Sequence, residues 1–237
     1  MNARDLGGLP TRSGATIRHG ALVRSESPEY LTETGERALV AHGIRTIVDL
    51  RLPDEAARSP YFFLGRQNHG IRYVNLSLLN PDPSAWGPPT ATLPPLAQDY
   101  QDMLDRSGAQ VGAIMRSIAN AEEGGILVHC AAGKDRTGLV VALLLDLAGV
   151  PRDVIAADYA LSSENLRERQ QAWVEEAPAE RAEREAMILR GTTLPEVMLD
   201  VLAYLDARYG GTEGYLRACG CGHEHVARIR ARLLAEG

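Results

Sequence analysis

The feature that most constrains the fold of this chain is a ten-residue segment, 129–138, that separates two apolar runs. Residues 126–128 are Ile, Leu and Val, which favour a β-strand. Residues 139–147 are almost entirely apolar and are soon followed by a Gly and a Pro, which is typical of a helix and its stop. The pattern predicts a strand, a tight loop and a helix, with the helix beginning at Thr137 or Gly138.

The loop between them combines a cysteine and an arginine at Cys-x5-Arg spacing. In order, the segment reads His129, Cys130, Ala131, Ala132, Gly133, Lys134, Asp135, Arg136, Thr137 and Gly138. Free N–H groups and the positive end of the helix dipole point into such a loop and favour a tetrahedral oxyanion. Lys134, Arg136 and the helix N-terminus also stabilise a thiolate at Cys130. The spacing therefore indicates in-line attack of a thiolate on phosphorus, through a cysteinyl-phosphate intermediate.

This hypothesis gives most residues of the segment a role. Cys130 is the candidate nucleophile, Arg136 binds two phosphoryl oxygens, and Asp135 protonates the leaving oxygen and later activates water. The expected substrate-binding residues are Ala131, Ala132, Gly133, Lys134, Thr137 and Gly138. His129 supports the thiolate, or is simply a buried residue at a strand end, and Thr137 either donates to the sulfur or caps the helix. No metal or organic cofactor is expected.

Two other interpretations of the segment explain less of it. A nucleotide-binding P-loop needs Ser or Thr directly after the Lys and Gly five residues before the second Gly. This chain has Asp135 and Val128 at those positions. A structural cysteine in a basic helix-capping turn would account for Cys130 alone, but not for the whole segment.

The segment His-Cys-x-x-Gly-Lys-x-Arg-Thr-Gly resembles the signature of the cysteine-dependent protein-tyrosine phosphatase superfamily. Its Gly-Lys-Asp-Arg-Thr version resembles the atypical bacterial and fungal branch, and residues 2–8, 22–25, 48–51 and 158–162 are similar to further motifs of that branch. The resemblance implies a protein-tyrosine phosphatase, with phosphoserine, phosphothreonine or phosphoinositide esters as further substrates. It also implies that Asp5 and its neighbours lie near the loop and support it.

The rest of the chain predicts an α/β fold with a central, mainly parallel sheet flanked by helices, as in the tyrosine phosphatases that it resembles. Short β-prone runs alternate with helical stretches, at 17–18 with 21–23, 46–50, 71–74 and 125–129. Ligands in such folds bind beyond the C-terminal strand ends, where Cys130 falls. Arg24, Asp49 and Arg51 also lie at predicted strand ends, where each braces the loop, meets the phosphate, or is a solvated charge.

The general acid has a second possible source. Residues 80–95 are rich in Pro and predict a long loop or flap beside the site. Because more familiar tyrosine phosphatases carry an acidic residue on an upstream loop, Asp82 and Asp99 are alternatives to Asp135. Residues 100–121 then predict one helix with an apolar face.

The C-terminal half predicts further helices on a single domain, 1–237. The strongly charged stretch within 163–190 is either a solvated helical pair or a helical lid over the active site, as some phosphatases that this chain resembles carry. The other expected helices span 153–166, 194–208, 212–218 and 226–234.

A cluster near the end of the chain has its own alternatives. Cys219, Cys221, His223 and His225 are borderline zinc ligands, but their spacing is tighter than that of structural zinc sites, so a helix–loop–helix connection is the preferred interpretation. The two cysteines could also act as resolving thiols in an arsenate reductase, which likewise uses Cys-x5-Arg. A phosphate-binding module without turnover is the third functional class considered.

Composition bounds the partners. A net charge of −6 over 237 residues argues against a nucleic-acid binder, and no apolar run is long enough to span a bilayer. Because motif residues begin at position 2, no signal peptide is expected, and a reactive cysteine suits a reducing cytoplasm. Export without a signal peptide is the alternative. The expected partner is a phosphorylated protein or a phosphoinositide, and the sequence is silent on oligomeric state.

Overall fold

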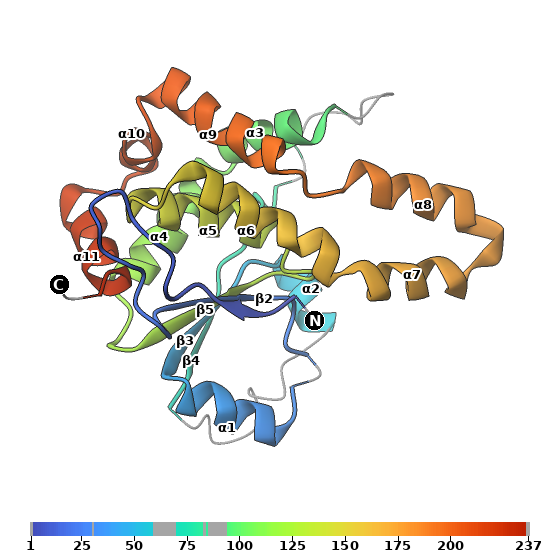
Figure 1. Ribbon diagram of the computed structural model, residues 1–237, viewed down its shortest axis with the longest axis horizontal. Coiled ribbons are helices and arrows are strands. Elements are labelled where there is room, and N and C mark those ends of the chain that lie inside the picture. Colours follow the sequence, from blue (N-terminus) through green and yellow to red (C-terminus); the bar gives the residue numbers. More distant parts are fainter. Residues whose placement is uncertain (1, 30, 59–69, 83, 85–93, 236–237) are drawn as a thin grey trace.

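The frame of the fold is a five-stranded sheet (Figure 1), seen in a computed structural model that describes residues 2–29, 31–58, 70–82, 84 and 94–235. In spatial order the strands are β1 (Arg4–Asp5), β2 (Leu22–Ser25), β5 (Gly125–His129), β3 (Ile44–Asp49) and β4 (Arg72–Asn75). Only β1 is antiparallel to its neighbour. The α/β class with a mainly parallel sheet is therefore confirmed.

The register of the parallel strands brings their carboxyl ends to one level. Ser25 pairs with His129, His129 with Asp49, and Asp49 with Asn75. The segment that follows His129 therefore leaves the sheet at its centre, with the ends of β2 and β3 on either side. This is the edge at which parallel sheets bind their ligands.

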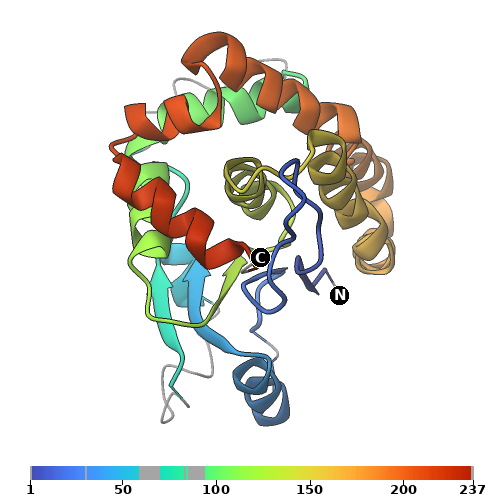
Figure 2. The ribbon, with the colours of Figure 1, turned by 60° about the vertical axis from the view of Figure 1, so that its left-hand side comes forward.

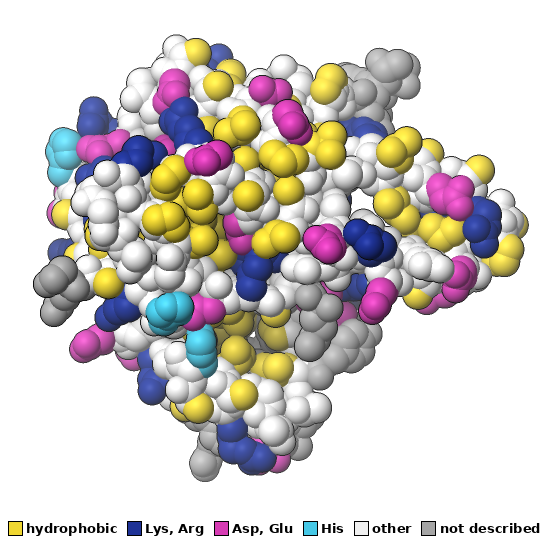
Figure 3. Space-filling view, in the orientation of Figure 1, with side chains coloured by type: hydrophobic (Ala, Val, Ile, Leu, Met, Phe, Trp, Pro, Cys, Tyr) yellow, Lys and Arg dark blue, Asp and Glu magenta, His cyan; other side chains and the backbone are white. Residues whose placement is uncertain are grey.

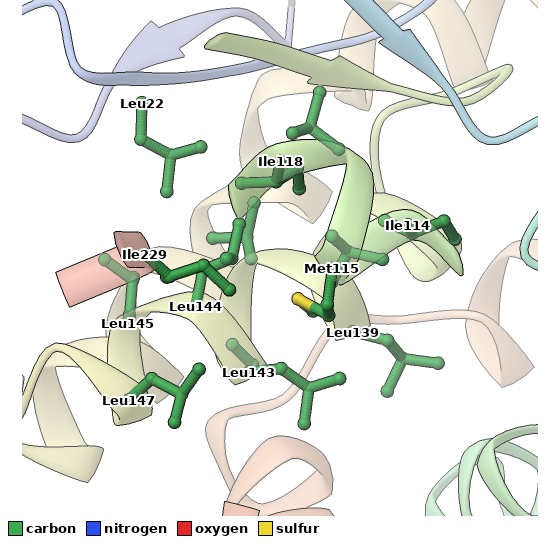
Figure 4. Packing of buried hydrophobic residues seen from close by; sticks show 14 of the residues in the cluster. Leu22, Ile114, Met115, Ile118, Leu139, Leu143, Leu144, Leu145, Leu147 and Ile229 are labelled. Atoms are coloured by element: carbon green, nitrogen blue, oxygen red, sulfur yellow. The ribbon is translucent and has the colours of Figure 1, made fainter. Parts of the chain in front are cut away.

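Helix α5 (Asp135–Leu147) is the centre of the hydrophobic core on one face of the sheet. Figure 4 shows its leucines packed toward β2, α4 (Gly108–Ala119) and α11 (His223–Leu233). Figure 2 shows other helices arranged around α5. The opposite face of the sheet carries a smaller core under α1 (Glu33–Ala41). Helices thus cover both faces, and α5 is fixed by burial along nearly its whole length.

The remaining helices lie elsewhere in the chain. They are α2 (Pro53–Arg58), α3 (Leu96–Arg106), α6 (Arg152–Asn165), α7 (Arg167–Glu176), η3 (Pro178–Glu180), α8 (Arg181–Arg190), α9 (Pro195–Tyr209) and α10 (Thr212–Ala218). In the described part of the chain, none of these helices is long and apolar enough to cross a membrane.

Helices α7 and α8 form a hairpin that stands out from the body of the protein (Figures 1 and 3). Arg184 joins its two arms, because its guanidinium lies 4.7 Å from the centre of the Trp173 ring and donates to the Trp173 carbonyl. Met187 and Leu189 on α8 are 58% and 77% exposed. A solvated helical pair was one of the two interpretations of this segment, and its action as a lid stays a prediction.

Three predicted helix boundaries are wrong, and the β-prone run at 17–18 is not a strand, since Ile17 forms an isolated bridge with Leu234. The helix expected over 100–121 is two helices, because the backbone leaves helical geometry at the buried Ser107. Helix α5 begins at Asp135, before Thr137, so the acidic residue belongs to its first turn. Helix α11 begins at His223, which draws the two histidines into a helix. Most of the predicted 80–95 loop lies outside the described residues.

Candidate active site

The loop after β5 is shaped by one glycine. Gly133 has φ +65°, and a Cβ there would lie 2.3 Å from the backbone oxygen of Ser25. Only glycine fits this turn, which brings the loop back onto the end of β2. Ala131 reinforces the same contact by accepting a hydrogen bond from the N–H of Ser27 at 3.0 Å. The loop is thus closed around Cys130, whose exposed fraction is 3%.

The N-terminus of α5 faces this loop. Lys134 is the N-cap residue, and its side chain makes no capping hydrogen bond to the helix. The first N–H groups of an α-helix have no partner within the helix, so they remain available to a ligand. Gly138, one turn on, packs so closely on Tyr159 that a Cβ would lie 3.0 Å from its ring. The start of α5 therefore combines an open N-terminus with a fixed position.

Arg136 is held by the carboxylate of Glu55, which no sequence motif indicated. Its Nη1 donates to Glu55 Oε2 at 2.6 Å and its Nη2 to Glu55 Oε1 at 2.9 Å. Burial lowers the pKa of Arg136, but the hydrogen bonds to Glu55 and the charge of Cys130 outweigh it and raise the pKa overall. Arg136 is therefore a permanent cation at the mouth of the loop.

Asp135 meets a buried pair of tyrosines. The Tyr100 hydroxyl donates to Asp135 Oδ1, and the Tyr159 hydroxyl lies 3.0 Å from that of Tyr100. Lys134 Nζ lies 3.6 Å from the same carboxylate oxygen and donates to the Gly191 carbonyl at 2.7 Å. Asp135 keeps 37% of its side chain exposed. Tyr100 therefore orients the Asp135 carboxylate from the protein interior, and the exposed part of the carboxylate faces solvent.

Arg24 braces the loop from inside the protein. Its side chain is fully buried and donates to the Gly133 carbonyl at 2.8 Å and to Asp158 Oδ2 at 2.6 Å. Arg4 binds the other oxygen of Asp158, also at 2.6 Å. Asn2 Nδ2 donates to the carbonyl oxygens of Ala132 and Gly133 at 3.0 and 3.1 Å. Of the roles considered for Arg24, the structure supports the bracing one.

Asp49 and Arg51 form a buried pair at the end of β3. Arg51 donates from Nε and Nη2 to Asp49 Oδ2 at 3.1 and 2.9 Å, and Tyr73 donates to the same oxygen at 2.7 Å. His129 lies beside them, with Nε2 3.7 Å from Asp49 Oδ1, and its Nδ1 donates to the Cys130 carbonyl at 3.0 Å. Burial lowers the pKa of His129 to about 4, although Asp49 opposes this. The imidazole is therefore neutral at physiological pH.

Asp5 lies away from the loop, contrary to expectation. Its carboxylate accepts hydrogen bonds from the backbone N–H groups of Gly7 and Gly20, both at 2.9 Å, and lies 3.0 Å from His42 Nε2. It sits on β1, which runs antiparallel to β2, so Asp5 lies toward the opposite end of the sheet. The N-terminal segment does support the loop, but through Asn2 and Arg4.

Thr137 lies within the first turn of α5 and does not cap it. Its hydroxyl is buried, and no hydrogen bond joins it to another group in the described part of the chain. The upstream aspartates are also outside the loop contacts: Asp99 pairs with Arg190 at 2.8 Å, and the exposed Asp82 accepts from the Ser84 N–H. Of the three candidate acids, only Asp135 belongs to the loop and helix that hold Cys130.

Cys219 and Cys221 lie in the turn between α10 and α11, as the helix–loop–helix interpretation predicted, while His223 and His225 belong to the first turn of α11. Cys221 Sγ contacts the Gly112 carbonyl of α4 at 3.7 Å, and His225 Nδ1 accepts from the Gly222 N–H. Within the described residues, no three His, Cys, Asp or Glu side chains are grouped as metal ligands. Burial raises the pKa of both cysteines, that of Cys219 to about 11, which disfavours the thiolates that a resolving role needs.

Two clefts border the loop. The larger, of about 500 Å³, lies between loop residues and the start of α7. Its lining includes Ala132, Lys134, Asp135, Leu166, Arg169 and Trp173. The smaller, of about 270 Å³, is lined by residues that include Ala131, Arg51, Glu55 and Arg169.

Several contributors to the site were missed because their contacts are distant in sequence. Asn2, Glu55 and Tyr100 contact the loop or the start of α5 from three separate segments. Tyr159 acts through Tyr100, and Asp158 through Arg24. Two motifs gave a local signal: 2–8 contains Asn2, and 158–162 contains Asp158 and Tyr159. They marked the segments without indicating their contacts.

Comparison with known proteins finds a matching family, similar relatives and a structural neighbour. The tyrosine phosphatase family matches residues 1–235. A tyrosine-protein phosphatase of Nostoc commune is 34% identical over 230 residues, which cover 94% of this chain and 78% of the relative. The triple specificity protein phosphatase PtpB of Mycobacterium tuberculosis is 31% identical over 270 residues, covering 98% and 96%. A solved structure of P. aeruginosa TpbA aligns with a TM-score of 0.44 at 19% identity, over 87% of this chain and 91% of TpbA.

Proposed function

Since this chain belongs to the tyrosine phosphatase family and is a phosphomonoester hydrolase, we propose that Cys130 is its nucleophile. The observation that carries the proposal is the closed loop around Cys130, with an uncapped helix N-terminus and Arg136 beside it. The thiolate attacks phosphorus, the bond to the leaving oxygen breaks, and water then hydrolyses the cysteinyl phosphate. The helix N–H groups and Arg136 stabilise the charge on the phosphoryl oxygens.

Asp135 is the general acid of this proposal. It follows the loop directly, its carboxylate is oriented by Tyr100, and it borders the larger cleft. It protonates the leaving oxygen in the first step and removes a proton from the attacking water in the second. Asp99 is a weaker candidate because it is engaged by Arg190.

The proposed substrate is a phosphotyrosyl protein. The larger cleft joins apolar groups, Leu166 and Trp173, to the charged groups of Lys134 and Arg169. Such a lining suits an aromatic ring that carries a phosphate and is flanked by acidic residues. Phosphoserine, phosphothreonine and phosphoinositide esters are further candidates, since one relative bears the name triple specificity phosphatase.

A panel of substrates tests the assignment. Phosphate release is compared for phosphotyrosyl, phosphoseryl and phosphothreonyl peptides and for soluble phosphoinositides, with wild-type protein and Cys130→Ser. We expect the highest kcat/KM for phosphotyrosyl peptides and turnover lowered by orders of magnitude in the variant. Sulfate or tungstate should still bind Cys130→Ser through the loop amides and Arg136. Wild-type turnover in Cys130→Ser would refute the assignment of Cys130 as the nucleophile. Equal kcat/KM values across the panel would refute the proposed preference for phosphotyrosine.

A further inference from the structure

Two buried tyrosine hydroxyls, the tyrosine pair, lie behind the carboxylate of Asp135. Tyr100, on α3, donates to Asp135 Oδ1, and the hydroxyl of Tyr159, on α6, lies 3.0 Å from that of Tyr100. The two residues are 2% and 1% exposed, and their rings meet edge to face with centroids 6.2 Å apart. Because burying a hydroxyl is costly, hydrophobic packing alone does not explain two of them at this position.

The direction of the hydrogen bonds follows from the number of protons available. An ionised carboxylate only accepts, so the single hydroxyl proton of Tyr100 points at Asp135 Oδ1. The oxygen of Tyr100 is then the acceptor for the proton of Tyr159. Burial and the charge of Asp135 raise the pKa of Tyr100, so its hydroxyl keeps its proton at neutral pH. The chain of donors therefore runs from Tyr159 through Tyr100 to Asp135.

This chain disfavours a proton on Oδ1 when Asp135 is protonated. A proton there requires both hydroxyls of the tyrosine pair to reverse, which leaves the proton of Tyr159 without an acceptor among the described residues. Lys134 Nζ, 3.6 Å from Oδ1, is a donor as well and cannot accept. Oδ2 is different, because no hydrogen bond reaches it in the part of the chain that the structure describes. Asp135 also lines the larger cleft.

We infer that Tyr100 is a positioning residue of the reaction, which makes Oδ2 the atom of Asp135 that transfers the proton. This rests on the proposed function, because it takes Asp135 as the general acid. As the S–P bond to Cys130 forms and the P–O bond breaks, the proton on Oδ2 passes to the leaving oxygen. The Tyr100 proton stabilises the negative charge at Oδ1. In the second step, Oδ2 takes a proton from the water that attacks phosphorus, and the S–P bond breaks.

The test compares two aryl phosphates of similar size that differ in their need for a proton. Phenyl phosphate has a poor leaving group, and p-nitrophenyl phosphate has a good one. In Tyr100→Phe, we expect kcat for phenyl phosphate to fall at least about 10-fold, and kcat for p-nitrophenyl phosphate to stay within about 3-fold of wild type. KM for both esters should change less than about 2-fold, because Arg136 and the loop amides still bind the phosphate.

Two further variants control for the loss of a buried hydroxyl. Tyr215→Phe removes one that is equally buried and donates at 2.8 Å to the carbonyl of Leu104, on the same helix as Tyr100. It should leave the ratio of the two kcat values within about 2-fold of wild type. Tyr159→Phe should change this ratio less than about 3-fold, since Tyr100 still donates to Oδ1. An effect of either control as large as that of Tyr100→Phe would overturn the inference in favour of a packing role.

Asp135→Asn separates the inference from the proposed function. It should slow phenyl phosphate far more than p-nitrophenyl phosphate, and adding Tyr100→Phe should change the ratio less than about 2-fold further, because the two residues act as a unit. If Asp135→Asn leaves the ratio unchanged, the proposed general acid is wrong and the role of Tyr100 falls with it. If Asp135→Asn changes the ratio and a folded Tyr100→Phe does not, only the role of Tyr100 is refuted.

Discussion

The buried ion pair of Arg24 and Asp158 should be the most stability-critical polar contact behind the loop. Arg24 is fully buried, Asp158 is 7% exposed, and their closest atoms are 2.6 Å apart. The change Asp158→Asn leaves the charge of Arg24 without its counterion, and also removes that of Arg4. Breaking a buried pair from one side costs about 3–5 kcal/mol, a large part of the roughly 5–15 kcal/mol by which proteins are stable.

The effect is measurable as a melting temperature. In a chain of this size, each kcal/mol corresponds to about 2–4 °C, so we expect Asp158→Asn to melt about 6–20 °C below wild type. The exposed pair of Arg152 and Asp206 is the comparison, because Asp206 is 50% exposed. Asp206→Asn should cost no more than about 1 kcal/mol. Differential scanning calorimetry of both variants at neutral pH gives the comparison.

The same variant should also weaken the loop. Arg24 fixes the Gly133 carbonyl, so a displaced guanidinium loosens the turn beside Cys130. We expect the vanadate inhibition constant of Asp158→Asn to rise at a temperature where the variant is still folded. Equal melting temperatures for Asp158→Asn and Asp206→Asn, within about 2 °C, would refute the reasoning that burial makes the pair critical.

Three further outcomes are expected. Asp135→Asn should slow phosphotyrosyl peptides far more than p-nitrophenyl phosphate, because an activated leaving group needs no proton; equal slowing would move the general acid elsewhere. Because the pKa of His129 is lowered to about 4 in the folded protein and is about 6.5 when unfolded, the unfolded state binds the extra proton. Stability should therefore fall as pH drops from about 6.5 to 4, by up to about 3 kcal/mol, and calorimetry of His129→Asn should show a shallower fall. Replacing Cys219 and Cys221 by Ser should leave phosphatase activity unchanged, and one zinc per chain by elemental analysis, lost in that variant, would contradict the assignment of a metal-free turn.

The parts of the fold that the sequence predicted are those encoded locally. Runs of adjacent residues predict the strand at 125–129, the following loop and the apolar helix. The alternation of strands and helices along the chain predicts the parallel sheet. The prediction of a single helix over 100–121 was wrong. The apolar spacing continues across Ser107, although the backbone leaves helical geometry there. Periodicity shows which side chains are buried, but it does not show where one helix ends and the next begins.

The sequence predicted the residues at the centre of the site but not most of the residues that support them. Cys130 and Arg136 are separated by five residues within one motif, so the short covalent connection keeps them close. Asn2 and Glu55 reach the loop over 130 and 81 residues, and such contacts depend on how whole elements pack. Asp5 shows the same difficulty. The N-terminal segment was correctly predicted to support the loop, but Asn2 contacts the loop, whereas Asp5 binds the Gly20 N–H toward the other end of the sheet.

The most direct test of the account is the identity of the phosphorylated residue during turnover. Wild-type protein is mixed with p-nitrophenyl phosphate, quenched within the first turnovers under conditions that preserve thiophosphates, and digested for mass spectrometry. The account predicts one phosphoryl group, on the peptide that contains Cys130, and none in Cys130→Ser. A phosphoryl group on another residue, or full turnover with no phosphorylated peptide and an unimpaired Cys130→Ser, would contradict it.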